Sequence, residues 1–201
     1  TGTSRMTTDP STCLVILAGG QSTRMGTDKA VITLRGRRMV DILIDRFAGK
    51  ADHLFLSASQ DYGTGLPLVS DNPDFPGGPV GGIFSLAERL PEVQPGLSGF
   101  ATVPVDAPRA PADLVERLSA SGVCAVAQDG QRIHPTFAYW RCDIINRISA
   151  THDLGERAPS LQWLARQSAA QSVTWSDETL FMNINRPEDL AAAEHDKTAG
   201  A

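Results

Sequence analysis

Near its N-terminus the chain carries Leu17-Ala18-Gly19-Gly20-Gln21-Ser22-Thr23-Arg24-Met25-Gly26-Thr27-Asp28-Lys29 directly after a short apolar run at 13–16. Paired glycines followed by small polar and basic residues are typical of a buried strand that leads into a phosphate-binding loop. Without a Cβ, Gly19 and Gly20 let the backbone turn sharply and bring N–H groups close to an anion. Arg24 and Lys29 add positive charge that suits a polyphosphate.

Two common nucleotide motifs are absent from this stretch. It has neither the P-loop pattern G-x-x-x-x-G-K-[ST] nor the dinucleotide pattern G-x-G-x-x-G, and the second absence disfavours a hydride-transferring oxidoreductase. The simpler interpretation is an ordinary strand-to-helix connection with helix-capping residues. The glycines are followed in sequence by Arg24, Gly26, Asp28 and Lys29, and this order favours a phosphate-binding loop over a simple connection.

The motif L-A-G-G-x-S-x-R-M-G-x-D-K resembles the signature loop of the molybdenum cofactor guanylyltransferases, the MobA family. This resemblance implies a GT-A-like nucleotidyltransferase fold. Relatives that act on sugar phosphates, on methylerythritol phosphate or on the cytosine form of the cofactor usually carry L-A-A-G instead. Gly19 therefore points to the guanylyltransferase branch, and the resemblance extends over nearly the whole chain, residues 13–194.

Size and composition are those of one ordinary globular domain. The 201 residues are 41% hydrophobic and 20% charged, with a net charge of −5 and three cysteines without metal-site spacing. The charge argues against broad binding to nucleic acid or anionic membranes, and the cysteines predict reduced thiols in a cytoplasmic protein. We expect a flexible N-terminal segment at 1–12, a single nucleotidyltransferase domain at 13–195 and a flexible C-terminal tail at 196–201.

Strand-like apolar runs alternate with helical patterns along the chain. Strands are expected at 13–18, 53–58, 66–70, 100–105, 123–127 and 136–140, and helices at 39–48, 82–90, 112–121, 144–150, 160–167 and 187–194. This alternation predicts an α/β fold of three α/β/α layers with a mostly parallel, Rossmann-like central sheet.

Glycine and acidic residues follow the expected strands rather than precede them. Gly19 and Gly20 follow the first strand, Asp71 follows the run at 66–70, and Asp106 follows the run at 100–105. In open α/β sheets, ligands bind outside the carboxyl ends of the strands. We therefore expect the three loops to converge on one binding edge.

Asp106 is the candidate metal ligand. It ends a buried apolar strand between Pro104 and Pro108, and Mg²⁺ prefers one or two carboxylates together with phosphates and water. The competing interpretation is an N-cap for the helix expected to begin near Pro111, but Asp106 lies several residues too early for that. The resemblance independently assigns the family's metal-binding aspartate to Asp106.

The resemblance implies further nucleotide contacts. Asp71, which could otherwise form an Asx-turn, matches a nucleotide-contacting aspartate, and Ser57 stands where relatives often have asparagine. The glycine cluster at 75–82 resembles a loop that closes over the base and ribose, although its composition alone also suits a connector. The expected nucleotide-binding residues are Leu17, Ala18, Gly19, Gly20, Lys29, Ser57, Asp71, Gly78, Gly82 and Asp106.

Two later segments resemble the pterin side of the family's site. One is D-G-x-x-x-H-P-T, which contains His134, and the other is F-x-N-x-N-x-P-E-D-L, which contains Asn183 and Asn185. We expect Asn183 and Asn185 to alternate along an extended strand and therefore to point to one face. A structural histidine and a helix cap at Asn185 are the competing interpretations. The expected pterin-binding residues are His134, Asn183 and Asn185.

The resemblance implies transfer of GMP from GTP to the molybdenum-carrying molybdopterin with release of pyrophosphate. Lys29, Arg24 and Asp106 would be catalytic, with Mg²⁺ as the cofactor. GTP and Mo-molybdopterin would be the substrates, a molybdoenzyme or its chaperone a further partner, and the chain a monomer or weak homo-oligomer. The alternatives are a nucleotidyltransferase that uses CTP or UTP on another small phosphate, and a non-catalytic nucleotide-binding regulatory module.

Overall fold

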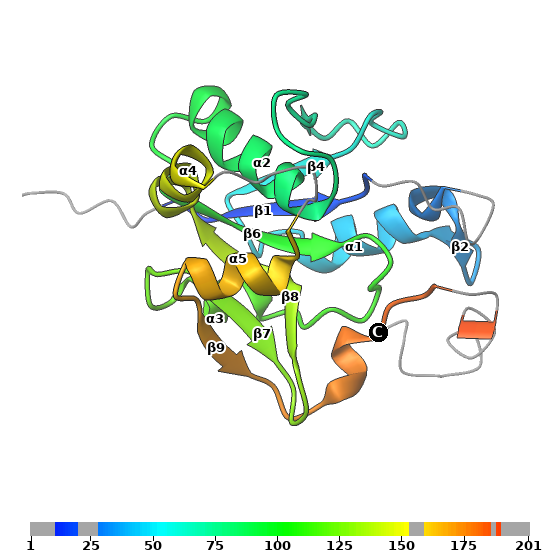
Figure 1. Ribbon diagram of the computed structural model, residues 1–201. Helices are drawn as coiled ribbons and strands as arrows, with labels where there is room; N and C mark the ends of the chain where they lie inside the picture. Colours follow the sequence, from blue (N-terminus) through cyan, green and yellow to red (C-terminus); the bar gives the residue numbers. More distant parts are fainter. Residues whose placement is uncertain (1–10, 20–27, 153–158, 186–187, 190–201) are drawn as a thin grey trace, which may run out of the picture.

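The computed structural model describes residues 11–19, 28–152, 159–185 and 188–189. Within these residues, seven strands form one sheet in the order β5-β4-β1-β6-β8-β7-β9 (Figure 1). The strands are β1 (Cys13–Leu17), β4 (His53–Ser57), β5 (Leu68–Val69), β6 (Gly99–Pro104), β7 (Ala125–Gln128), β8 (Ile133–Arg141) and β9 (Gln171–Thr174). A small separate hairpin joins β2 (Thr33–Leu34) to β3 (Arg37–Arg38).

The sheet is mostly parallel, as the sequence predicts. Strands β5, β4, β1 and β6 all run in the same direction, and β9 runs parallel to β7. Strand β8 is antiparallel to both of its neighbours, β6 and β7. Because β8 returns along β7 through a tight turn, its first residues come to the same edge as the carboxyl ends of β1 and β6.

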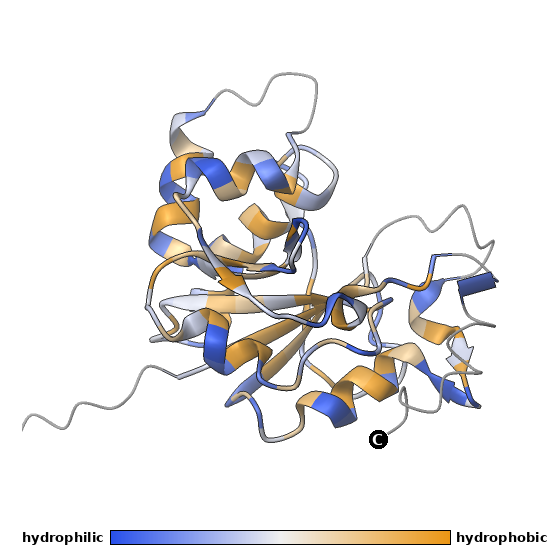
Figure 2. Cartoon of the chain, turned by 90° about the horizontal axis from the view of Figure 1, so that it is seen from below, coloured by the Kyte–Doolittle hydropathy of each residue, from blue (hydrophilic) through white to orange (hydrophobic). Residues whose placement is uncertain are grey.

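Helices cover both faces of this sheet. Helices α1 (Met39–Phe47) and α3 (Leu114–Ser119) pack on one face, and α2 (Pro79–Val93), α4 (Cys142–Thr151) and α5 (Leu161–Gln167) pack on the other. Strand β1 supplies both cores because its side chains alternate: Leu14 and Ile16 join the first cluster, whereas Cys13 and Val15 join the second. Figure 2 shows the hydrophobic character of the central strands. The three-layer α/β/α prediction is confirmed.

Several element boundaries differ from the sequence prediction. Strand β5 is shorter than the run at 66–70, and β8 begins at Ile133 rather than at 136. Helix α3 begins at Leu114, so Pro111 precedes the helix instead of lying in its first turn. Strand β9, the β2–β3 hairpin and the two 3-10 helices η1 (Lys29–Val31) and η2 (Glu178–Phe181) were not predicted. Most of the helix expected at 187–194 lies outside the described residues.

Hydrogen bonds between Thr12 and Asp52 hold the chain just before β1. The N–H and hydroxyl of Thr12 both donate to the Asp52 carboxylate, at 2.8 and 2.9 Å, directly before β4. This pair ties the residue before β1 to the start of the neighbouring strand.

Among the described residues, no helix has both the length and the apolar character needed to cross a membrane.

Helix α2 begins earlier than the predicted residue 82. Pro79 occupies its first turn, where the missing N–H costs no helical hydrogen bond, and Gly78 before it adopts a φ of 97°. Gly81 therefore lies inside the helix, directly against the loop that precedes it. A Cβ on Gly81 would come within 1.8 Å of the Pro76 carbonyl oxygen, which is a backbone atom.

This close approach makes Gly81→Ala destabilising, even though alanine normally favours a helix. We expect the free energy of unfolding to fall by about 1–3 kcal/mol, because either the loop or the helix must shift. Urea denaturation measures this change. Gly77→Ala is the matched control, since a Cβ there meets nothing within 4 Å, and its effect should stay within about 0.5 kcal/mol. A Gly81→Ala chain as stable as the wild type would contradict the packing described.

Candidate functional site

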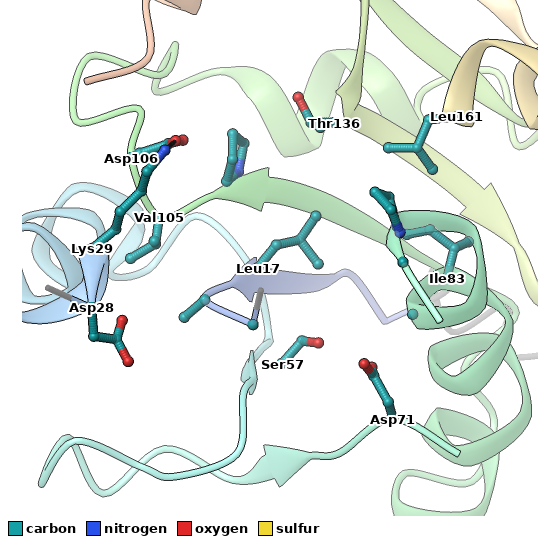
Figure 3. A pocket seen from close by; sticks show the side chains of 16 residues that line it. Leu17, Asp28, Lys29, Ser57, Asp71, Ile83, Val105, Asp106, Thr136 and Leu161 are labelled. Carbon is teal, nitrogen blue, oxygen red and sulfur yellow. Dashed lines mark hydrogen bonds and ion pairs between the residues drawn. The ribbon is translucent and has the colours of Figure 1, made fainter. Parts of the chain in front are cut away.

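A cavity of about 370 Å³ opens at the carboxyl ends of β1, β4 and β6 (Figure 3). It is lined by Leu17, Ala18, Gly19, Asp28, Lys29, Ser57, Asp71, Gly78, Pro79, Gly82, Ile83, Pro104, Val105, Asp106, Thr136 and Leu161. Every expected nucleotide-binding residue that the structure describes lies in this lining. Gly20 and Arg24 fall outside the described residues.

Lys29 and Asp106 form an ion pair at one end of this cavity. The Nζ of Lys29 donates to Asp106 Oδ2 at 2.5 Å and to Asn185 Oδ1, also at 2.5 Å. Both charged side chains are largely buried, with 20% and 11% exposure. Removing two charges from water is costly unless they pair closely, so this contact constrains the geometry of the whole end of the cavity.

Local sequence explains why Lys29 lies there. Asp28 is the N-cap of η1, and its Oδ1 accepts the N–H of Ala30 at 3.1 Å. The cap defines where the 3-10 turn begins, and Lys29 is the first residue of that turn. The DK pair of the motif therefore works as a unit: the aspartate shapes the turn and the lysine reaches Asp106.

One carboxylate oxygen of Asp106 is available to a ligand. Among the described residues, its Oδ1 is buried and has no hydrogen-bond partner, although Oδ2 is bound by Lys29. A buried carboxylate oxygen without a partner is unfavourable, and a cation would relieve it. No group of three or more His, Cys, Asp or Glu in the described part of the chain could hold a metal. The residues fit a Mg²⁺ that takes one carboxylate and completes its shell with phosphates and water.

Asp71 lies at the opposite end of the cavity from Lys29 (Figure 3). A Cβ on Gly82 would come within 3.5 Å of Asp71 Oδ1, so the carboxylate faces the first turns of α2. Between the two ends, the Ser57 carbonyl accepts the N–H of Ala18 at 2.9 Å, continuing the β1–β4 pairing beyond the strand. The sheet therefore holds the backbone at Ala18 and Ser57, two of the residues that line the cavity.

A second cavity of about 780 Å³ adjoins the first. It contains His134, Asn183 and Asn185, the three residues expected to bind a pterin, together with Arg132, Ser160 and Gln162. Pro79, Thr136 and Leu161 line both cavities, so the two spaces meet at these residues. Asn183 Oδ1 is buried without a hydrogen-bond partner among the described residues.

Asp129 holds His134 in place. Its carboxylate accepts the N–H groups of Gln131 and Arg132 at 2.7 and 2.8 Å, and it lies 2.7 Å from His134 Nε2. The Gln131 N–H, then His134 and then the Arg132 N–H lower the pKa of Asp129 to about 2. Because the carboxylate is ionised and can only accept, Nε2 of His134 carries the proton. The imidazole also stacks on Phe181, with ring centroids 4.6 Å apart.

The segment at 182–185 differs from the prediction. The asparagines were expected to alternate along a strand, but residues 182–185 form no strand. The N–H of Ile184 instead donates to the Asp106 carbonyl at 2.7 Å, which places the segment beside the metal-ligand candidate. The Asn185 N–H donates to Asp189 Oδ2 at 2.9 Å, a local contact of the kind found at helix starts. Asn185 thus has a capping contact and also contacts Lys29.

Sequence reasoning missed several contacts and lining residues of the site. The Lys29–Asn185 contact joins positions 156 apart, and no local pattern signals it. Thr136 and Leu161 are ordinary strand and helix residues whose place between the cavities depends on the sheet order. Asp129 could have been found, because an aspartate followed by Gly-Gln-Arg is typical of an Asx-turn whose carboxylate accepts nearby N–H groups.

Comparisons with known proteins agree with this architecture. The sequence profile of the MobA-like NTP transferase domain matches residues 14–171. A molybdenum cofactor guanylyltransferase from Cereibacter sphaeroides is 40% identical over 187 residues, which cover 90% of this chain and 94% of that protein.

Two solved structures share the fold. Molybdopterin-guanine dinucleotide biosynthesis protein A from Archaeoglobus fulgidus superposes with a TM-score of 0.67 at 17% identity, covering 90% of this chain and 96% of that one. The 2-C-methyl-D-erythritol 4-phosphate cytidylyltransferase from Thermus thermophilus gives a TM-score of 0.63 at 16% identity, covering 92% and 97%. These structures show the fold, and the profile match and the 40% identity show that this chain belongs to the MobA-like NTP transferase family.

Proposed function

We propose that this chain is a molybdenum cofactor guanylyltransferase, which transfers GMP from GTP to the terminal phosphate of Mo-molybdopterin and releases pyrophosphate. One observation carries the proposal: the Lys29 ammonium, at one end of the first cavity, binds both Asp106 of that cavity and Asn185 of the second. A reaction that joins two large phosphorylated substrates needs a cation between two binding sites. The identity with the Cereibacter protein supports the choice of substrates.

The first cavity is the proposed GTP site. Its backbone floor at Leu17–Gly19 and the lysine at one end suit a triphosphate, while Asp71 at the other end would accept hydrogen bonds from the base or ribose. The walls from Gly78 and Gly82 carry no side chains, which leaves room for a flat group. Arg24, which lies outside the described residues, is proposed as a second cation for the phosphates.

The second cavity is the proposed pterin site. His134, held by Asp129, offers a ring of defined orientation, and the buried Asn183 Oδ1 is an acceptor that no donor of the described residues satisfies. A pterin carries amino and ring N–H donors in its plane, which would satisfy such an acceptor. The residues shared by the two cavities would bring the terminal phosphate of this substrate towards the GTP site.

The proposed chemistry is in-line attack of that phosphate on the α-phosphorus of GTP. A phosphate monoester is already anionic near neutral pH, so no strong base is required and repulsion between the two anions is the main obstacle. Lys29 offsets this charge and is already desolvated by its pairing with Asp106, so little reorganisation is needed. A Mg²⁺ on Asp106 would neutralise further phosphate charge and stabilise the leaving pyrophosphate.

The test is pyrophosphate release from GTP, ATP, CTP and UTP, each with Mg²⁺ and Mo-molybdopterin, alongside thermal melting with each nucleotide. Of the four nucleotides, we expect only GTP to give pyrophosphate release. We also expect GTP at about 100 times its Kd to raise the melting temperature by several degrees. Release specific to CTP or UTP would instead indicate a sister transferase. Binding without release under any condition would indicate a regulatory module.

Removing the ammonium should affect turnover more than stability. Lys29→Met keeps the apolar stem of the side chain but loses the charge that contacts Asp106 and Asn185, so we expect kcat to fall by roughly 100-fold or more. Steady-state kinetics and urea denaturation of the same samples separate the two effects. Lys50→Met is the matched control, since Lys50 is an exposed lysine after α1, and it should keep full activity. Loss of stability with normal turnover per folded molecule would contradict a catalytic Lys29.

Asp106→Asn tests the proposed role of Asp106 as a Mg²⁺ ligand. The amide oxygen can still accept from Lys29, but the side chain no longer offers an anionic oxygen to a cation. We therefore expect the Mg²⁺ concentration for half-maximal activity to rise roughly 10- to 100-fold, as measured by titrating Mg²⁺ at saturating GTP. Glu92→Gln, which neutralises an exposed carboxylate on α2, should leave the titration unchanged. An identical Mg²⁺ dependence in Asp106→Asn would rule against the ligand role.

A further inference from the structure

The loop between β4 and β5 reaches across to the residue before Lys29. The hydroxyl of Tyr62, in the middle of this loop, donates to Asp28 Oδ2 at 2.5 Å. The other oxygen of Asp28 caps η1 by accepting the Ala30 N–H. The Asp28 carboxylate is therefore held from two sides, and the turn it caps begins with Lys29. No motif in the sequence singles out this tyrosine.

Tyr62 is itself held in an uncommon conformation. Its φ is 52°, in the left-handed region that bulky residues rarely adopt. The guanidinium of Arg38 binds the Tyr62 carbonyl at 2.6 Å and is anchored in turn by the Asp41 carboxylate at 2.6 and 2.8 Å. A strained backbone persists only where its surroundings maintain it, and such positions concentrate at functional sites.

The phenol keeps its proton at neutral pH. Burial first, and then the Asp28 carboxylate, raise the pKa of Tyr62 to about 12. Tyr62 therefore acts as a permanent hydrogen-bond donor to Asp28, and its ring packs against the core cluster under β1 and α1. The ring of Tyr62 is thus anchored on the packed core, and its hydroxyl contacts Asp28, which lines the first cavity.

We infer that Tyr62 is a positioning residue for Lys29 and acts through Asp28, an inference that rests on the proposed role of Lys29. By orienting the carboxylate that caps η1, the hydroxyl holds the turn in the register from which the Lys29 ammonium reaches both Asp106 and Asn185. In the part of the chain that the structure describes, Tyr62 bonds to Asp28 and Arg38 and makes no hydrogen bond to Asp106 or Asn185. Its loss leaves the charge present but less well placed, which slows the chemical step more than it weakens nucleotide binding.

The experiment combines kinetics with labelling of lysine amines. Tyr62→Phe removes only the hydroxyl. Tyr139→Phe is the control: it removes the other tyrosine hydroxyl of the chain, on β8, where Tyr139 pairs with Ala101 of β6. Asp28→Ser breaks the same contact from the other side, because serine is a good N-cap but is too short to reach Tyr62. Each variant and the Tyr62→Phe/Asp28→Ser double variant are assayed for kcat and for KM with GTP. Acetylation of Lys29 and of exposed Lys50 is followed by mass spectrometry of peptides.

We expect kcat to fall about tenfold in Tyr62→Phe with little change in KM, and the double variant to be no slower than Asp28→Ser alone. Lys29 should be acetylated several times faster than in the wild type, with Lys50 as the internal reference and Tyr139→Phe unchanged in both measurements. Wild-type kcat and labelling in Tyr62→Phe, or strictly multiplicative losses in the double variant, would overturn the positioning role. A wild-type chain without pyrophosphate release would contradict the proposed function, and the labelling would still decide whether Tyr62 holds Lys29.

Discussion

The ion pair between Lys29 and Asp106 is the contact on which the site depends. It joins the end of the glycine-rich motif to the loop after β6 at 2.5 Å, and Asn185 is a second partner of the ammonium. These three residues come from widely separated parts of the chain, so their meeting requires the whole sheet to be assembled. This arrangement puts a largely buried positive charge in contact with one residue of each cavity.

The sheet order explains why the contact forms. Strand β1 lies between β4 and β6, so the loops that follow all three open at one edge, where Gly19 after β1, Ser57 of β4 and Asp106 after β6 line one cavity. The antiparallel β8 then brings Thr136 and His134 beside the end of β6. A fully parallel sheet would have put the start of that strand at the opposite edge. The single reversed strand thus creates the second cavity next to the first.

Much of this could be predicted from the sequence, because it depends on local pattern. The apolar runs predict the strands of both cores, and the glycines and acids after them predict the binding edge at Gly19, Asp71 and Asp106. The missed features depend on tertiary contacts. Strand β9, Gln171–Thr174, is mostly exposed and polar, so it has no apolar signal. Asn185 meets Lys29 only because Ile184 docks on the Asp106 carbonyl, and Tyr62 reaches Asp28 through a loop without a motif.

The most direct test of the account is a crystal structure with a non-hydrolysable GTP analogue and Mg²⁺. The account predicts the triphosphate over the Leu17–Gly19 backbone, the α-phosphate in contact with Lys29 and the metal on the free Oδ1 of Asp106. The base should lie towards Asp71, and the second cavity should stay open for the other substrate. Phosphates bound in the second cavity, or a metal held by residues other than Asp106, would contradict it.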